Sequence, residues 1–195
     1  MPNIHFNAEQ HIYTVDGKEL PSVTTICRFL SYDYKSNRPW LAEAAAKRGT
    51  AIHEACALMD YGEEAEAPPE MAGYLAAYRR FLSDYQPEWL GIERPLGSLD
   101  LGYAGTPDRF GIIGGRRVLV DIKTGRLHVP AVSAQLWGYE TLLATADFDA
   151  IQADYALRLD KSGIYELRPI DPSYPLFTAC RLLHDATTTK KGPLK

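Results

Sequence analysis

The chain has 195 residues, of which 46% are hydrophobic and 24% are charged, a composition typical of a globular protein with a sizeable core. Its 21 Lys and Arg residues stand against 25 Asp and Glu residues, so the formal net charge of −4 excludes a uniformly basic surface. The three scattered cysteines, Cys27, Cys56 and Cys180, exclude a four-cysteine metal or iron–sulfur cluster and favour reduced thiols.

We expect one domain over residues 1–195 that opens with a small β element over about residues 1–20, where alternating segments flank a turn at Asp16-Gly17. Ser22 is expected to cap a short helix that follows it. The first residues lack the basic start and apolar run of a signal peptide, and no stretch approaches the ~20 apolar residues of a membrane span. We therefore expect a cytoplasmic protein without a membrane partner.

Two helices are expected after Pro39. The alanine-rich run from Trp40 to Arg48 is a strong helix former that Gly49 should end, and Thr50 should restart a helix to about Tyr61.

The later segments alternate between helical and strand-like patterns, which implies an α/β fold with a mixed central sheet flanked by helices. The expected elements follow in chain order: a helix over 70–84, strand-like runs containing 92–93, 103–113 and 118–123, a helix over 131–146, strands over 151–159 and 164–170, a helix over 174–185, and a flexible tail over about 187–195.

A Gly-Gly dipeptide at 114–115 predicts a tight antiparallel hairpin. If these two residues form the loop, Ile113 pairs with Arg116, and counting outward places Asp108 opposite Asp121. The Cβ atoms of directly opposed residues lie about 4.5–5.5 Å apart.

The two faces of this hairpin differ in chemistry. Lys123 lies on the face of Asp121, whereas Val118, Val120 and Ile122 form an apolar stripe on the other face. One face is therefore expected to pack in the core and the other to carry the chemistry.

Two carboxylates this close disfavour each other's ionised form, so the Asp108–Asp121 pair either raises one pKa or acquires a cation. Few, hard oxygen ligands with room for water and phosphate suit magnesium or manganese. Such an ion can polarise a phosphodiester, and Lys123 could position the attacking water or stabilise developing charge. The alternative is a surface salt bridge between strand carboxylates and a lysine.

Four more residues are candidates for the same site, each with a structural alternative. His53, in the first turn of the predicted helix from Thr50, is a metal ligand or a core histidine. Glu93 is another carboxylate for the metal or its water, or a solvent-facing residue. Gln135 and Tyr139, four residues apart on one helix face, either meet a phosphate or form the polar edge of a packed helix.

Other catalytic patterns are missing. His53-Glu54 does not begin a zincin motif, because position 57 is Ala. The sequence also lacks a GxxxxGK[ST] phosphate loop, a GxSxG elbow and a GxGxxG fingerprint.

In this order, His53 and the segments 105–108 (Gly-Thr-Pro-Asp), 121–125 (Asp-Ile-Lys-Thr-Gly) and 135–139 (Gln-Leu-Trp-Gly-Tyr) closely resemble the RecB-type branch of the PD-(D/E)XK nuclease superfamily. The resemblance implies a restriction-endonuclease-like core. It implies one or two Mg²⁺ or Mn²⁺ ions held by His53, Asp108, Asp121 and the Ile122 carbonyl. It makes Lys123 catalytic and gives Gln135 and Tyr139 a role in supporting the site or the DNA backbone. Glu93 is similar to an acidic residue of lambda-type exonucleases.

The function expected from this resemblance is a metal-dependent DNA exonuclease in recombination, repair or DNA processing. Many relatives carry a four-cysteine iron–sulfur cluster, which is not expected here. The compact chain resembles stand-alone phage or prophage enzymes, so the expected setting is the cytoplasm of a bacterial or phage-infected cell, with DNA and a single-strand annealing or other recombination protein as partners. The alternatives are a structure- or sequence-specific endonuclease and an inactive DNA-binding module of the same fold.

Overall fold

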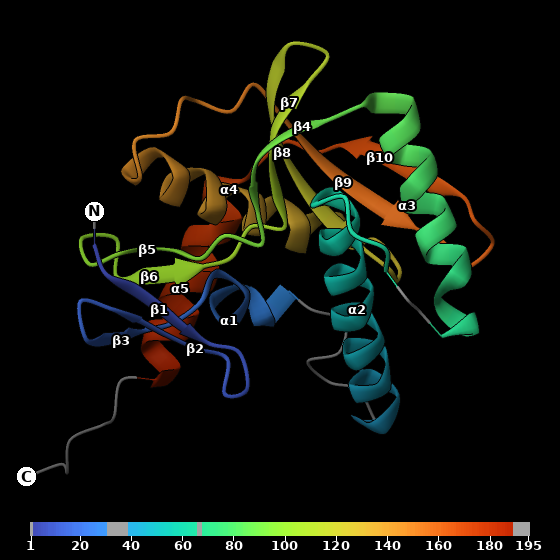
Figure 1. Cartoon of the computed structure of the whole chain (residues 1–195). Helices are drawn as coiled ribbons and strands as arrows, with labels where there is room; N and C mark the ends of the chain where they lie inside the picture. The colour runs from blue at the N-terminus through green and yellow to red at the C-terminus, as the bar shows by residue number, and fades with distance from the viewer. Residues whose placement is uncertain (1, 31–38, 66–67, 189–195) are drawn as a thin grey trace, which may run out of the picture.

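A mixed five-stranded sheet forms the centre of the molecule, which is described by a computed structural model over residues 2–30, 39–65 and 68–188 (Figure 1). The strand order is β10-β9-β8-β7-β4, and β8 and β9 are the parallel pair. The strands of this sheet are β4 (Glu88–Ile92), β7 (Arg109–Ile113), β8 (Arg116–Lys123), β9 (Ala153–Leu159) and β10 (Tyr165–Pro169).

Two smaller sheets lie beside it. The N-terminal segment forms the three-stranded sheet β1-β2-β3, and its turn at Asp16-Gly17 has positive φ angles at both residues. A two-stranded sheet pairs β5 with β6. The bounds are β1 (Ile4–Asn7), β2 (Ile12–Val15), β3 (Lys18–Leu20), β5 (Leu96–Ser98) and β6 (Tyr103–Gly105).

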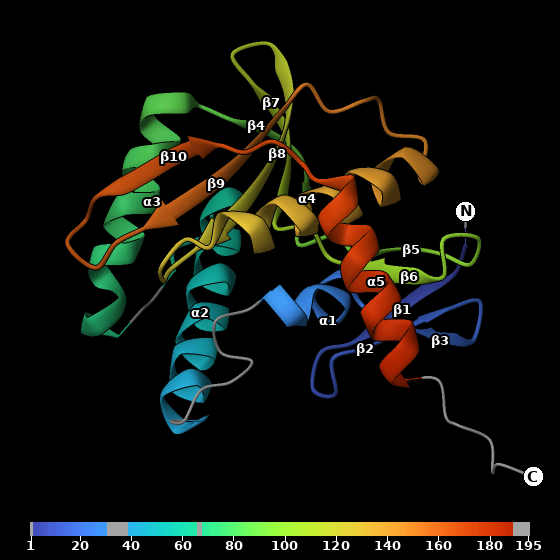
Figure 2. The same ribbon diagram turned by 180° about the vertical axis from the view of Figure 1, so that it is seen from behind.

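Helices cover both faces of the central sheet (Figures 1 and 2). Helices α2 and α3 pack on one face, and α1, α4 and α5 pack on the other. The helices are α1 (Val23–Cys27), η1 (Arg28–Leu30), α2 (Pro39–Asp60), η3 (Pro69–Met71), α3 (Ala72–Tyr85), α4 (Val129–Thr145) and α5 (Tyr174–Thr188). The expected mixed α/β fold with flanking helices is confirmed, and no helix in the described ranges is long and apolar enough to cross a membrane.

The hairpin register follows the prediction. Ile113 pairs with Arg116, and the ladder continues to Arg109 opposite Val120. Gly114 and Gly115 have φ angles of 57° and 76°, as a type I′ turn requires at both central residues. If this register is extended by one residue, Asp108 lies opposite Asp121.

Both faces of this hairpin are buried, which corrects the expectation of one core face and one chemical face. The predicted stripe of Val118, Val120 and Ile122 packs against α2 and α3. On the other face, Phe110 and Leu119 pack in the core formed with α1, α4 and α5. The chemistry is therefore confined to the end of the hairpin rather than spread over a face.

Two predicted boundaries were wrong. Helix α2 runs without a break through Gly49, because a helical glycine costs only about 1 kcal/mol relative to alanine and the buried Ile52 and Cys56 secure the second half. His53 therefore lies well inside a helix and not in its first turn. The run 103–113 divides into β6 and β7, which belong to different sheets, because Thr106-Pro107-Asp108 interrupts it.

The ends of the remaining elements shift by a few residues. Ser22 caps α1, as predicted, by accepting a hydrogen bond from the Thr25 N–H at 3.0 Å. Helix α5 continues to Thr188, so the first two residues of the predicted tail are helical. Residues 189–195 lie outside the described residues.

Candidate active site

Most of the predicted site residues lie at the edge of the central sheet where β4 and β8 end and β7 begins. Strand β8 ends at Lys123, and the antiparallel neighbour β7 begins beside Asp108. Strand β4 runs antiparallel to β7 and ends directly before Glu93. Helix α2 brings His53 over this edge, where its imidazole contacts the β8 backbone.

Three side chains place possible metal ligands close together. The donor atoms of His53, Glu93 and Asp108 all lie within 4.8 Å of one another. His53 Nδ1 is 3.4 Å from Glu93 Oε1 and 3.4 Å from Asp108 Oδ1. In the part of the chain that the structure describes, Asp121 does not join this group.

The backbone of Ile122 contacts two members of this group. His53 Nε2 lies 3.1 Å from the Ile122 carbonyl oxygen, and the Ile122 N–H donates to Asp108 Oδ2 at 2.6 Å. The end of β8 thus fixes both the imidazole and the carboxylate. It also brings the Ile122 carbonyl, a ligand expected from the sequence resemblance, against His53.

Asp121 and Lys123 form the second part of the site. Lys123 Nζ lies 2.6 Å from Asp121 Oδ2. This oxygen is buried and has no partner with hydrogen-bond geometry among the described residues, so the contact is an ion pair without a well-directed hydrogen bond. Asp121 is 4% exposed, and a carboxylate at this depth requires a nearby cation to stay ionised.

The electrostatics separate the two aspartates. Burial raises the pKa of Asp121 to about 6, against the opposing effect of Lys123. Burial acts in the same direction on Asp108, but His53, Lys123 and the Ile122 N–H outweigh it and lower the pKa of Asp108 to about 2. The predicted conflict between two close carboxylates therefore leaves Asp108 ionised and raises the pKa of Asp121.

The basic groups respond to the same carboxylates. Burial opposes the charge on His53, but Asp108 and Glu93 outweigh it and raise its pKa to about 10. Burial likewise opposes the charge on Lys123, and Asp121 and Asp108 raise its pKa above the usual value. Lys123 is therefore a cation at neutral pH and cannot serve there as a general base.

Glu93 is held in an uncommon backbone conformation. Its φ angle is 43°, a left-handed region that residues other than glycine seldom adopt. The Glu93 N–H donates to the Asp108 carbonyl at 2.9 Å, and Arg109 Nη1 donates to Glu93 Oε1 at 2.9 Å. Such strain collects at functional sites, and the Glu93 carboxylate here lies 3.4 Å from His53 Nδ1.

A buried ion-pair network under the site was not predicted. The fully buried Arg109 donates through Nε to Asp60 Oδ2 at 2.5 Å and through Nη1 to Glu93 and the Asp108 carbonyl. Asp60 also accepts hydrogen bonds from Tyr78 and Trp89. The sequence held one signal, an arginine opening an otherwise apolar strand directly after Asp108, but the partners come from distant elements.

Tyr139 lies at the site, and its close packing depends on a glycine. A Cβ atom at Gly105 would lie 2.9 Å from Tyr139 Cε1, so only glycine lets the ring approach the strand that leads to Asp108. Burial, reinforced by Asp108 and Asp121, raises the pKa of Tyr139 well above its usual value, so the phenol stays protonated. Gln135, one turn earlier on α4, is half-buried, and its predicted role stays a prediction.

The donor set fits a hard divalent cation. Atoms that bind one octahedral ion at about 2.1 Å lie about 3 Å apart, close to the 3.4 Å separations around His53 Nδ1. Two carboxylates and one imidazole leave positions for water and phosphate oxygens, as Mg²⁺ and Mn²⁺ require. His53 would bind the ion as the neutral imidazole, so metal binding would release its proton. The fit rests on His53, Glu93 and Asp108, with Asp121 as a further carboxylate held by Lys123.

Solved structures similar to this chain include two of the same protein, at low identity. The crystal structure of LHK-Exo in complex with dAMP has 15% identity and a TM-score of 0.44 and covers 86% of this chain and 85% of that chain. The crystal structure of an alkaline exonuclease (LHK-Exo) from Laribacter hongkongensis has 14% identity and a TM-score of 0.40 and covers 85% of this chain and 84% of that chain.

The crystal structure of SSO0001 has 18% identity and a TM-score of 0.38 and covers 76% of this chain and 73% of that chain. No protein-family model matches the sequence, and no curated protein matches it. At these identities the similarity describes the arrangement of helices and strands, so the function is inferred from the site itself.

Proposed function

We propose that this protein is a metal-dependent nuclease that hydrolyses phosphodiester bonds in DNA. The observation that carries the proposal is the grouping of donor atoms from His53, Glu93 and Asp108 within 4.8 Å of one another, beside the Asp121–Lys123 ion pair. Acidic and imidazole ligands suit a divalent cation, and an adjacent ammonium suits a phosphate. The motif order that resembles RecB-type nucleases supports the same conclusion.

A bound Mg²⁺ or Mn²⁺ ion would supply polarisation of the phosphodiester and a more acidic water. His53, Glu93 and Asp108 would hold it, with Asp121 and the Ile122 carbonyl as further ligands. Lys123 would stabilise the negative charge that develops on the phosphate or orient the attacking water, since its ammonium stays protonated. Gln135 and Tyr139 would contact the DNA backbone or support the carboxylates as neutral hydrogen-bond donors.

We further propose that the enzyme is an exonuclease. With a net charge of −4, DNA binding has to rely on local groups, and sequence-specific cutting inside a duplex needs side chains that read base edges. Sequence-tolerant cleavage from a free end requires fewer contacts. The RecB-type resemblance supports a role in DNA recombination, repair or processing, with a single-strand annealing or other recombination protein as partner, in the cytoplasm of a bacterial or phage-infected cell.

The test uses end-labelled linear single- and double-stranded DNA with Mg²⁺, Mn²⁺ or EDTA. Wild-type protein is expected to cleave only with metal, and Asp121→Asn is expected to abolish cleavage. Asp154→Asn is the matched control, since Asp154 is a buried aspartate on the next strand, outside the site. Undiminished cleavage in EDTA would contradict the metal-dependent mechanism.

The exonuclease assignment has its own test. Linear DNA should be degraded, whereas the covalently closed circular form of the same DNA should survive under identical metal and salt. Rapid cutting of the closed circle would instead favour the endonuclease alternative.

A further inference from the structure

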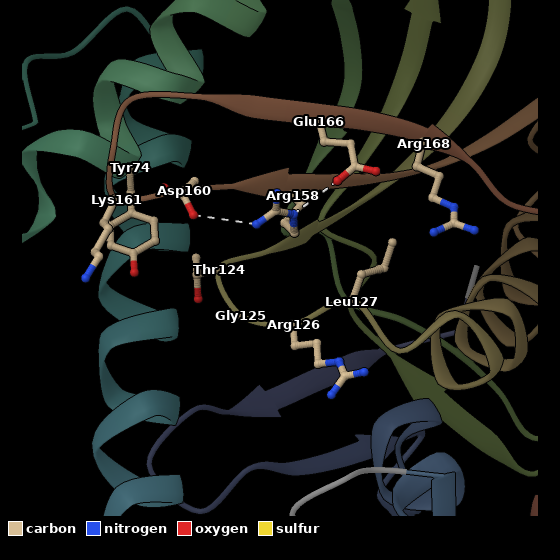
Figure 3. A pocket seen from close by; sticks show the side chains of 10 residues that line it. All are labelled: Tyr74, Thr124, Gly125, Arg126, Leu127, Arg158, Asp160, Lys161, Glu166 and Arg168. Atoms are coloured by element: carbon tan, nitrogen blue, oxygen red, sulfur yellow. Dashed lines mark hydrogen bonds and ion pairs between the residues drawn. The ribbon is translucent and has the colours of Figure 1, made fainter.

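A polar cavity opens at the end of β8, and Figure 3 shows the residues that line it. Its volume is about 510 Å³. We call it the basic pocket, and it begins one residue beyond Lys123, because Thr124 lines it. Its walls come from the loop after β8, the β9–β10 hairpin and α3, and its lining residues are Tyr74, Thr124, Gly125, Arg126, Leu127, Arg158, Asp160, Lys161, Glu166 and Arg168.

Basic side chains outnumber acidic ones in this pocket. Arg126, Arg158, Lys161 and Arg168 line it together with only two acidic residues. This local excess of positive charge stands out in a chain whose net charge is −4. The pocket is therefore a place where the protein can attract an anion.

Arg158 forms ion pairs with both acidic residues of the pocket, Asp160 and Glu166. Arg158 Nη1 lies 3.6 Å from Asp160 Oδ2, and Arg158 Nε donates to Glu166 Oε2 at 3.2 Å. Figure 3 draws Arg158 between these two carboxylates. Lys161 and Arg168 make no salt bridge within the described part of the chain and are exposed, so their charges remain available to a ligand.

The sheet register connects the pocket to the site. Arg158 on β9 is the register partner of Lys123 on β8, and Arg168 lies on β10, one strand further. Neighbouring strands are about 4.8 Å apart, so Arg168 on β10 lies roughly 10 Å across the sheet from β8. The carboxylates Glu93 and Asp108 lie on the opposite side of Lys123, toward β7 and β4.

The pocket wall is held in place by close backbone packing. A Cβ atom at Gly73 of α3 would lie 1.7 Å from the Lys161 carbonyl oxygen, so the β9–β10 turn rests directly on the helix. Within the turn, Asp160 Oδ1 accepts hydrogen bonds from the Ser162 N–H at 2.9 Å and the Ser162 hydroxyl at 2.7 Å. Lys161 is thus carried by a constrained turn.

We propose that the basic pocket binds a backbone phosphate of the same DNA strand whose neighbouring phosphodiester is cleaved at Lys123. Arg168 contacts this phosphate, and Lys161, at the other end of the pocket in Figure 3, contacts a further phosphate along the same strand. Arginine and lysine are the side chains suited to phosphate recognition. This inference rests on the proposed nuclease function and adds the path of the strand, from the carboxylates across β8 toward β10.

The experiment compares Arg168→Gln and Lys161→Gln with wild type. The control is Arg79→Gln, which removes the charge of an exposed arginine on α3 that does not line the pocket. Binding to an end-labelled single-stranded oligonucleotide is measured by fluorescence anisotropy in EDTA at several salt concentrations. Thermal melts establish that each variant is folded.

Loss of one phosphate contact should reduce the slope of log K against log salt by about 0.7 for single strands. We expect this reduction for Arg168→Gln and for Lys161→Gln, and the wild-type slope for Arg79→Gln. In cleavage assays the two pocket variants should raise KM and leave kcat close to wild type, because the contact is made equally in ground and transition states. Arg168→Glu should weaken binding more than Arg168→Gln.

A terminal phosphate and an internal phosphodiester are distinguished by repeating the titration with 5′-phosphorylated and 5′-hydroxyl oligonucleotides. A loss confined to the phosphorylated oligonucleotide identifies a terminal phosphate, and an equal loss with both identifies an internal one. Either result supports the pocket.

Unchanged salt slopes and KM values for Arg168→Gln and Lys161→Gln, in a wild-type protein that cleaves DNA, would overturn the pocket and leave the nuclease function standing. A wild-type protein that binds the oligonucleotide through these residues but never cleaves would support the pocket and overturn the nuclease. A protein that neither binds nor cleaves DNA would overturn both.

Discussion

Two pairs of acidic residues lie on the same side of the central sheet, and only one of them is accompanied by cations. Asp121 is the register partner of Ala156, two residues after Asp154, so both aspartates face the α4 side. Asp121 lies beside Lys123 and Asp108. Asp154 instead meets Glu140 of α4, and neither makes a salt bridge with any described residue.

The difference appears in the pKa values. Burial raises the pKa of both aspartates, but Lys123 limits the rise for Asp121 to about 6. Glu140 and Asp171 add to the effect of burial on Asp154 and raise its pKa to about 8. One face of a sheet can therefore hold ionised carboxylates where an ammonium and backbone N–H groups accompany them, and protonated carboxyls elsewhere. Negative charge for a metal is concentrated at the end of β8.

The largest effect is expected from Asp121→Asn, which should reduce cleavage to background while leaving thermal stability equal or higher. The change removes a buried carboxylate whose pKa is raised, so folding no longer has to bury a negative charge at this position. Cleavage and melting curves measured beside Asp154→Asn check both parts. Wild-type cleavage by Asp121→Asn would remove this residue from the catalytic set.

Lys123→Gln should make the active-site pair resemble the Glu140–Asp154 pair. Loss of the ammonium is expected to lower the single-turnover rate by about 10²–10³, the scale for a lost electrostatic stabiliser. Affinity for Mn²⁺, measured by calorimetry, should change much less. A variant that cleaves at the wild-type rate once saturated with metal would assign Lys123 to metal binding instead.

His53→Gln should weaken metal binding, because it removes one of the three donors, from His53, Glu93 and Asp108, that lie within 4.8 Å of one another. The expected result is reduced activity that high Mn²⁺ concentrations partly restore, because a missing ligand lowers affinity more than it alters the chemical step. Rates measured across a Mn²⁺ titration check this. If the variant melts early yet cleaves normally at low temperature and ordinary Mn²⁺, His53 is a core residue and not a ligand.

The last effect concerns stability and pH rather than cleavage. The folded-state pKa of Asp154 is about 8, above the usual 3.8, so the folded protein binds a proton that the unfolded chain releases between about pH 4 and 8. Stability should fall as pH rises through this window, by at most about 1.4 kcal/mol per pH unit. Asp154→Asn should flatten this dependence and raise stability at pH 8.

Urea unfolding at pH 5 and pH 8 measures the effect of Asp154→Asn. Glu140→Gln serves as the companion variant, since burial raises the pKa of Glu140 as well. If both variants lose stability with pH as steeply as wild type, the pair does not titrate in this window.

The sequence alone was sufficient where local geometry decides. The β7–β8 register follows from two glycines that can adopt positive φ angles, and that register predicts the approach of Asp108 to Asp121. The hydrophobic pattern of β8 likewise predicts the face that packs on α2 and α3. The Ser22 cap is a local hydrogen bond and was also predicted.

Tertiary structure decided what depends on contacts between distant segments. The packing of Ile52 and Cys56 carries helix α2 through Gly49, and the strained turn at Glu93 is stabilised by Arg109 and Asp60 from other elements. The basic pocket joins the loop after β8, the β9–β10 hairpin and α3. The conformation of a turn depends on a few consecutive residues and can be predicted from the sequence. Burial and charge pairing depend on which distant segments meet in space.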